Sequence, residues 1–61
     1  MYKKYVELRD ERNFTDYKVS KETGIAKSTF TDWKNGRSKP KVEKLKKIAD
    51  FFNVTVDELI G

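Results

Sequence analysis

The 61-residue chain contains neither cysteine nor histidine, so it must fold without disulfides and without the thiolate and imidazole ligands of most metal sites. A domain this small buries only about 60% of the surface that its unfolded chain exposes. Its stability must come from apolar packing, to which eight aromatic residues contribute the largest side chains. Because histidine is also the commonest general base near neutral pH, we expect no catalytic residues, no metal and no cofactor.

Charge is unevenly distributed along the chain, although the net charge is only +4. Residues 26–47 hold eight basic and two acidic side chains, whereas residues 48–61 hold three acidic side chains and no basic one. A basic middle beside an acidic end favours a polyanionic ligand on one side of the molecule. A solvated lysine-rich surface has the same composition, so charge alone leaves both interpretations open.

The first half of the chain predicts three short helices. Apolar residues recur at helical spacing over residues 2–12, and Asn13 is a plausible stop. Thr15 is expected to cap a second helix that ends near Thr23, with Gly24 in the left-handed conformation that follows many helices. A third helix is expected over about residues 26–35, with a buried stripe made of Ala26, Phe30 and Trp33.

The second half predicts two more helices after a basic loop at residues 37–41. The fourth, over about residues 42–52, has an apolar stripe in helical register, made of Val42, Leu45, Ile48, Ala49 and Phe52. Thr55 and Glu58 form a capping box that opens a short last helix. No stretch has the length or pattern of a membrane span or an export signal. We therefore expect a single all-α domain over residues 1–61, located in the cytoplasm.

Residues 15–35 have the pattern of a helix-turn-helix, in which two short helices flank a turn containing glycine. The second of the two helices has an apolar inner stripe and an outer face of short polar or basic side chains. Such a helix can enter a DNA major groove, about 12 Å wide, and bring compact donors and acceptors to the bases. The basic loop after it suits the phosphates that orient a protein on the duplex.

Nearly the whole chain resembles the lambda-repressor-like, Cro-type (XRE) helix-turn-helix family. The matching residues are Leu8-Arg9, Phe14-Thr15, Val19-Ser20, Gly24-Ile25, Ser28-Thr29-Phe30, Trp33, Asn35-Gly36, Lys39-Pro40 and residues 52–59. The resemblance implies a compact five-helix domain with a central helix-turn-helix. It also implies sequence-specific binding of double-stranded DNA, in a bacterial or phage-type transcriptional regulator and most simply a repressor.

The resemblance also assigns residues to the two kinds of DNA contact. The base-reading positions correspond to Lys27, Ser28, Thr29 and Asp32. The phosphate-contacting positions correspond to Arg9, Thr15, Asn35, Arg37 and Lys39. The family often has glutamine at the position of Asp16 and a carboxylate at that of Lys34, and a carboxylate at position 16 would repel a phosphate. For Tyr17, a contact with the DNA backbone and no contact at all remain equally open.

Phe51 and Phe52 are adjacent, so if one ring enters the core the other is expected to be exposed. An exposed Phe51 suggests a hydrophobic contact between two copies of the chain, together with Val54, Val56 and Ile60. The expected partners are thus a palindromic DNA operator and a second copy in a weak homodimer, with no small-molecule ligand. The alternative is a protein-interaction module on the same scaffold, which binds a partner through the Phe51 surface.

Overall fold

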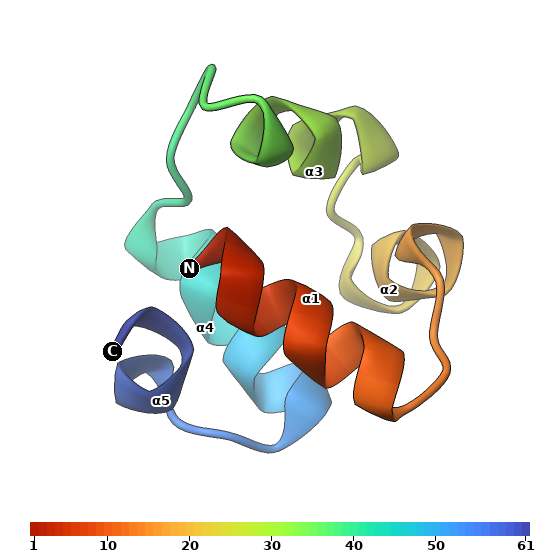
Figure 1. Ribbon diagram of the computed structural model, residues 1–61, viewed down its shortest axis with the longest axis vertical. Coiled ribbons are helices and arrows are strands. Elements are labelled where there is room, and N and C mark those ends of the chain that lie inside the picture. The colour runs from red at the N-terminus through yellow and green to blue at the C-terminus, as the bar shows by residue number, and fades with distance from the viewer.

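The computed structural model describes all residues 1–61 as five helices without a strand (Figure 1). In chain order they are α1 (Tyr2–Glu11), α2 (Asp16–Thr23), α3 (Lys27–Lys34), α4 (Val42–Phe52) and α5 (Val56–Ile60). The predicted all-α class and the number of helices are confirmed. No helix has the length and apolar character needed to cross a membrane.

The helix ends follow the local signals of the sequence. The Thr15 hydroxyl accepts a hydrogen bond from the Lys18 amide at 3.1 Å, and Gly24 ends α2 with φ of 77°. At α5, the Thr55 side chain and the Glu58 side chain each bond to the other residue's backbone amide, which completes the predicted capping box. Thus local side-chain chemistry determines where these helices begin and end.

Every helix contributes to one core of eleven buried side chains. Four of these side chains come from α4. The centre of the core is an aromatic cluster in which the rings of Tyr5 and Phe30 are stacked, with centroids 4.9 Å apart. The edge of Phe52 packs against Tyr5 at 6.1 Å. The full set is Tyr5, Leu8, Val19, Ile25, Phe30, Trp33, Leu45, Ile48, Ala49, Phe52 and Leu59.

Two residues that were predicted to lie in buried stripes are exposed. Ala26 is the residue that precedes α3, so its side chain does not lie on the inner face of that helix. Val42 is 73% exposed because it is the first residue of α4, and the buried part of this helix starts one turn later at Leu45. Both predictions were wrong for the same reason: helical spacing identifies a face but does not tell at which residue the helix begins or its buried part starts.

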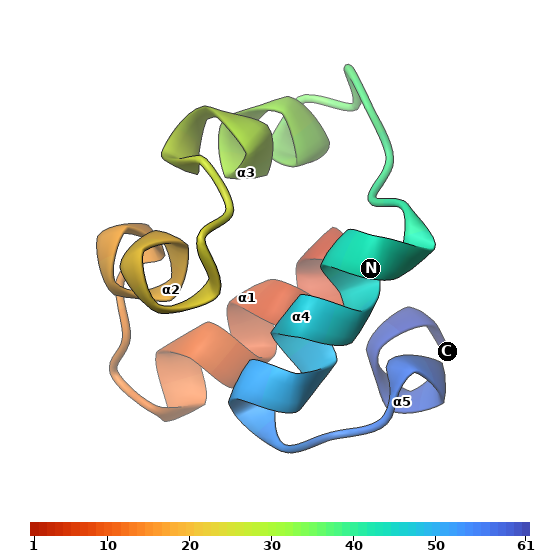
Figure 2. The ribbon, with the colours of Figure 1, turned by 180° about the vertical axis from the view of Figure 1, so that it is seen from behind.

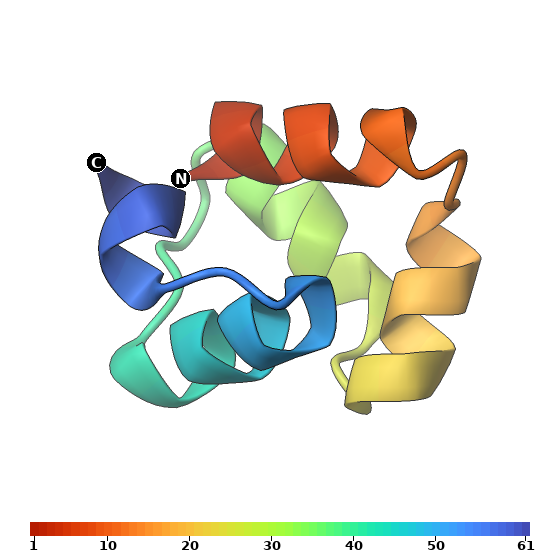
Figure 3. The same cartoon turned by 90° about the horizontal axis from the view of Figure 1, so that it is seen from below.

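The helices are arranged so that α3 and α5 lie at opposite ends of the molecule. In Figures 1 and 2, α3 occupies the top edge while α5 lies at the lower side, next to the N-terminal part of α1. Figure 3 shows α1 above α4, with α2 closing one end and α5 the other. The helix α3 is therefore separated from the acidic C-terminal helix, which packs against α4 and α1 instead.

Candidate nucleic-acid interface

The inner face of α3 is fixed to the body of the protein by two aromatic rings. Phe30 and Trp33 are 1% and 7% exposed, and their rings meet edge to face with centroids 5.2 Å apart. This packing leaves Lys27 and Ser28 on the opposite side, exposed and free of ion pairs within the chain. The start of α3 thus presents one cation and one hydroxyl in a fixed orientation.

The other two predicted base-reading residues are only partly accessible and face the loop that follows α3. Thr29 lines a shallow groove together with Ser38 and Lys39. Asp32 holds Arg37 in two ways: its carbonyl oxygen accepts the Arg37 amide at 2.9 Å, and its carboxylate lies 3.8 Å from the guanidinium. Within the predicted set, Lys27 and Ser28 are the two most open to a ligand.

The loop between α3 and α4 carries exposed cations beside the C-terminal end of α3. Gly36 has φ of 73°, a left-handed conformation that glycine adopts without strain and that turns the chain directly after Asn35. Arg37 and Lys39 follow it, and both are exposed. Three of the predicted phosphate-contacting residues therefore lie together on this turn.

The remaining two predicted phosphate contacts, Arg9 and Thr15, are already engaged within the protein. The Thr15 hydroxyl oxygen caps α2, as described above. Only 21% of the Arg9 side chain is exposed, and its guanidinium lies between two carboxylates, 3.0 Å from Asp10 and 3.0 Å from Asp16. Burial disfavours the charged form, but the bonds to these carboxylates outweigh it and raise the pKa of Arg9 above its ordinary value.

Asp16 is the centre of a polar network that the sequence does not predict. One of its carboxylate oxygens, Oδ1, accepts a hydrogen bond from the Tyr5 hydroxyl at 2.5 Å as well as the bond from Arg9. Burial, reinforced by the bond to Asp16 and its negative charge, raises the pKa of Tyr5 well above its ordinary value. In the sequence, the only indication of this network is that Tyr5 and Arg9 are four residues apart and so share one face of α1. That spacing does not identify Asp16 of α2 as their partner.

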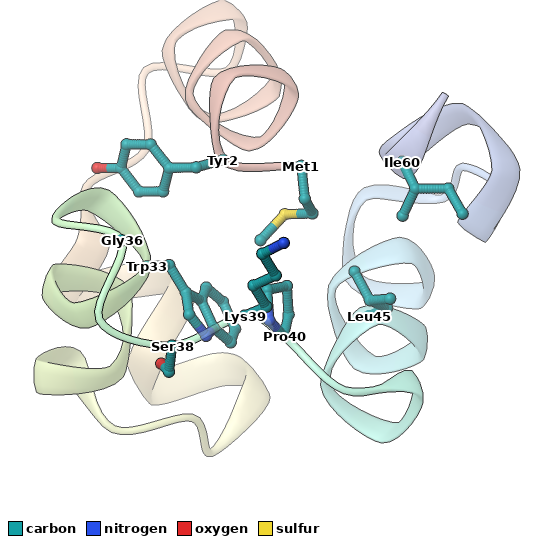
Figure 4. A pocket seen from close by; sticks show the side chains of 9 residues that line it. All are labelled: Met1, Tyr2, Trp33, Gly36, Ser38, Lys39, Pro40, Leu45 and Ile60. Carbon is teal, nitrogen blue, oxygen red and sulfur yellow. The ribbon is translucent and has the colours of Figure 1, made fainter.

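The residues predicted to form a dimer contact do not form one exposed patch. Phe51 is half-buried rather than exposed, because the chain between α1 and α2 brings Phe14 against it, with ring centroids 5.5 Å apart. Val54 and Val56 are also partly buried against the core. Ile60 is 54% exposed and lines a hollow between the N-terminus and the α3–α4 loop, which none of the other three residues borders (Figure 4).

Comparison with known proteins places the chain in a family. A helix-turn-helix family profile matches residues 7–59. The chain is 40% identical over 55 residues to the HTH-type transcriptional regulator AnsR of Bacillus subtilis, an alignment that covers 90% of this chain and 47% of that protein. Over 58 residues it is 33% identical to the HTH-type transcriptional activator BcrR of Enterococcus faecalis, covering 95% of this chain and 28% of BcrR.

A third relative is the cryptic phage CTXphi transcriptional repressor RstR of Vibrio cholerae, 33% identical over 55 residues, which cover 90% of this chain and 50% of the repressor. The chain thus spans half or less of the length of these relatives. No solved structure matches it significantly. The profile match, these relatives and the five-helix fold together show that the chain belongs to the Cro-type (XRE) helix-turn-helix family.

Proposed function

We propose that this chain binds double-stranded DNA sequence-specifically and acts as the DNA-binding part of a transcriptional regulator. The observation that carries the proposal is the fixed orientation of α3, whose buried rings leave Lys27 and Ser28 exposed beside a cationic turn. A helix held in this way keeps the same side chains toward the groove each time it binds. The relatives named above come from bacteria, where DNA lies in the cytoplasm, so we propose that the chain works there.

In this proposal two groups of residues have different tasks. Lys27 and Ser28 contact base edges, since a lysine donates well to guanine and a hydroxyl adapts to several acceptors. Thr29 and Asp32 adjust this readout from the loop side of α3. Arg37 and the rest of the turn neutralise phosphates, which adds affinity for any sequence.

Repression is the simplest mode of regulation, because occupancy of a site on DNA is enough to exclude other proteins from it. Two of the related proteins named above are called an activator and a repressor, so both modes occur on this scaffold. We also propose that two copies bind a palindromic operator as a weak homodimer, with the exposed Ile60 at the C-terminal end in the contact. A strict monomer in sedimentation, bound singly to its operator, would argue against the dimer.

The direct experiment is selection of bound duplexes from a random pool with the purified chain. Enrichment of one motif supports specific readout, and an inverted repeat supports binding by two copies. Ser28→Ala is then expected to change the preference at one base position by about 1–3 kcal/mol. Arg37→Ala is expected to lower the affinity for all sequences about equally and to reduce the salt dependence of binding. Salt-independent binding without any enriched motif would contradict the proposal and favour a protein partner instead.

A further inference from the structure

A polar hollow lies where α1, the start of α2 and the end of α3 meet. It is open to solvent and has a volume of about 490 Å³, which is ample for a phosphate group, and most of the residues that line it are polar. The charged groups around it are Arg9 from α1, Asp16 from α2 and Lys34 from α3. Arg9 is paired with Asp16 and also with Asp10, so the charge left to attract an anion into the hollow is that of Lys34.

The three charges in the hollow are not equivalent. Arg9 and Asp16 are joined at 3.0 Å, and the same oxygen of Asp16 also accepts the Tyr5 hydroxyl. Lys34 is exposed, and none of the five ion pairs in the chain includes it. The unpaired positive charge in the hollow therefore belongs to Lys34, whereas the charge of Arg9 is shared with carboxylates.

We propose that Lys34 contacts a backbone phosphate of duplex DNA in this hollow, and that Asp16 is a positioning residue that holds Arg9 at its edge. This inference rests on the proposed function, because it identifies contacts within that interface. Asp16 lies at the first turn of α2, where a carboxylate that faced a phosphate would weaken binding. Paired with Arg9 and Tyr5, it instead fixes the direction of a guanidinium that Asp10 alone would hold from only one side.

The two roles predict different responses to removal of a charge. Lys34→Gln is expected to lower duplex affinity about fivefold at physiological salt and to reduce the salt slope by about 0.9, the effect of one phosphate contact. Lys47→Gln is the matched control, since Lys47 is an exposed lysine of α4 that lines a separate hollow with Asp50 and Phe51. It is expected to change affinity less than about twofold.

Asp16→Asn tests the positioning role through the sign of its effect. If Asp16 only repelled phosphate, the substitution would raise affinity. If Asp16 instead holds Arg9, the substitution is expected to lower duplex affinity about threefold, which corresponds to the weakening of one charge-assisted hydrogen bond. In an Arg9→Gln background the loss is expected to disappear, because there is no guanidinium left to position. Thermal melts of each variant confirm that it is folded before binding is measured.

A readout without DNA separates this inference from the proposed function. Inorganic phosphate, titrated at low ionic strength, is expected to shift the NMR signals of the Arg9 side chain and the Asn35 amide. The shifts should vanish in Lys34→Gln and remain in Lys47→Gln. If phosphate binds in this way but no duplex does, the proposed function fails while the anion site stands. Duplex binding that Lys34→Gln and Lys47→Gln weaken equally, or an affinity gain in Asp16→Asn, would overturn the inference.

Discussion

Replacement of Tyr5 by phenylalanine isolates the partly buried hydrogen bond that joins α1 to α2. The ring of Tyr5 is fully buried and stacked on Phe30, so phenylalanine keeps the packing and removes only the hydroxyl. Asp16 then retains its bond from Arg9 but loses the one from Tyr5. The variant is expected to fold with an unchanged core.

The loss of stability follows from the charge and exposure of the acceptor. A hydrogen bond to a charged group contributes about 1.5–3 kcal/mol net, and the Asp16 side chain is 30% exposed, so water replaces part of the bond. We therefore expect Tyr5→Phe to lower the free energy of unfolding by about 1–2 kcal/mol at pH 7. In a domain of this size, 1 kcal/mol corresponds to a fall in Tm of about 4–8 °C.

The same bond makes this difference depend on pH. The pKa of Tyr5 is raised in the folded state by burial and by Asp16, whereas the unfolded chain ionises near its ordinary value of about 10. The contribution of the Tyr5 hydroxyl to the free energy of unfolding is therefore complete below about pH 10, and above that pH it falls by up to about 1.4 kcal/mol per pH unit. Phenylalanine has no proton to lose, so the wild type and Tyr5→Phe are expected to have equal free energies of unfolding at about pH 11.

Urea unfolding of both proteins between pH 7 and pH 11 measures the effect. Tyr17→Phe is the matched control, because Tyr17 is 63% exposed and its hydroxyl makes no hydrogen bond within the chain. It is expected to change stability by less than about 0.5 kcal/mol at every pH. A Tyr5→Phe variant as stable as the wild type at pH 7, or a difference that stays constant up to pH 11, would refute the reasoning.

Three further substitutions test the fold. Gly24→Ala is expected to cost about 1 kcal/mol in a thermal melt, since an added Cβ meets no atom within 4 Å but φ of 77° disfavours any side chain; a neutral result would contradict this. Phe30→Ala should remove about 3–5 kcal/mol and leave the chain largely unfolded by circular dichroism, so a cooperative melt near that of the wild type would argue against its place in the core. Val42→Ser is expected to be nearly neutral in urea unfolding, and a loss above about 1 kcal/mol would mean that this exposed side chain is buried.

The sequence predicts those parts of the structure that depend on neighbours along the chain. The cap at Thr15, the left-handed Gly24 and the capping box at Thr55 each involve groups within three or four residues. The bond between Tyr5 and Asp16 and the contact of Phe14 with Phe51 join separate segments, so no local pattern indicates them. Long-range contacts of this kind engage Arg9 within the protein and leave Phe51 half-buried, so neither side chain is as accessible as the sequence predicts.

The candidate DNA-binding surface keeps a fixed conformation because of the core rather than because α3 is stable by itself. This helix has only eight residues, and Ala26 at its start makes no side-chain cap, so it would not persist as an isolated helix. Its stability comes from Phe30 and Trp33, which anchor it to α1 and to the rest of the core through the stacked Tyr5. Because Tyr5 also bonds to Asp16, one residue links the packing of α3 to the network around Arg9. Loss of the whole Tyr5 side chain should therefore reduce DNA binding through both elements, whereas loss of the hydroxyl alone acts only through the network around Arg9.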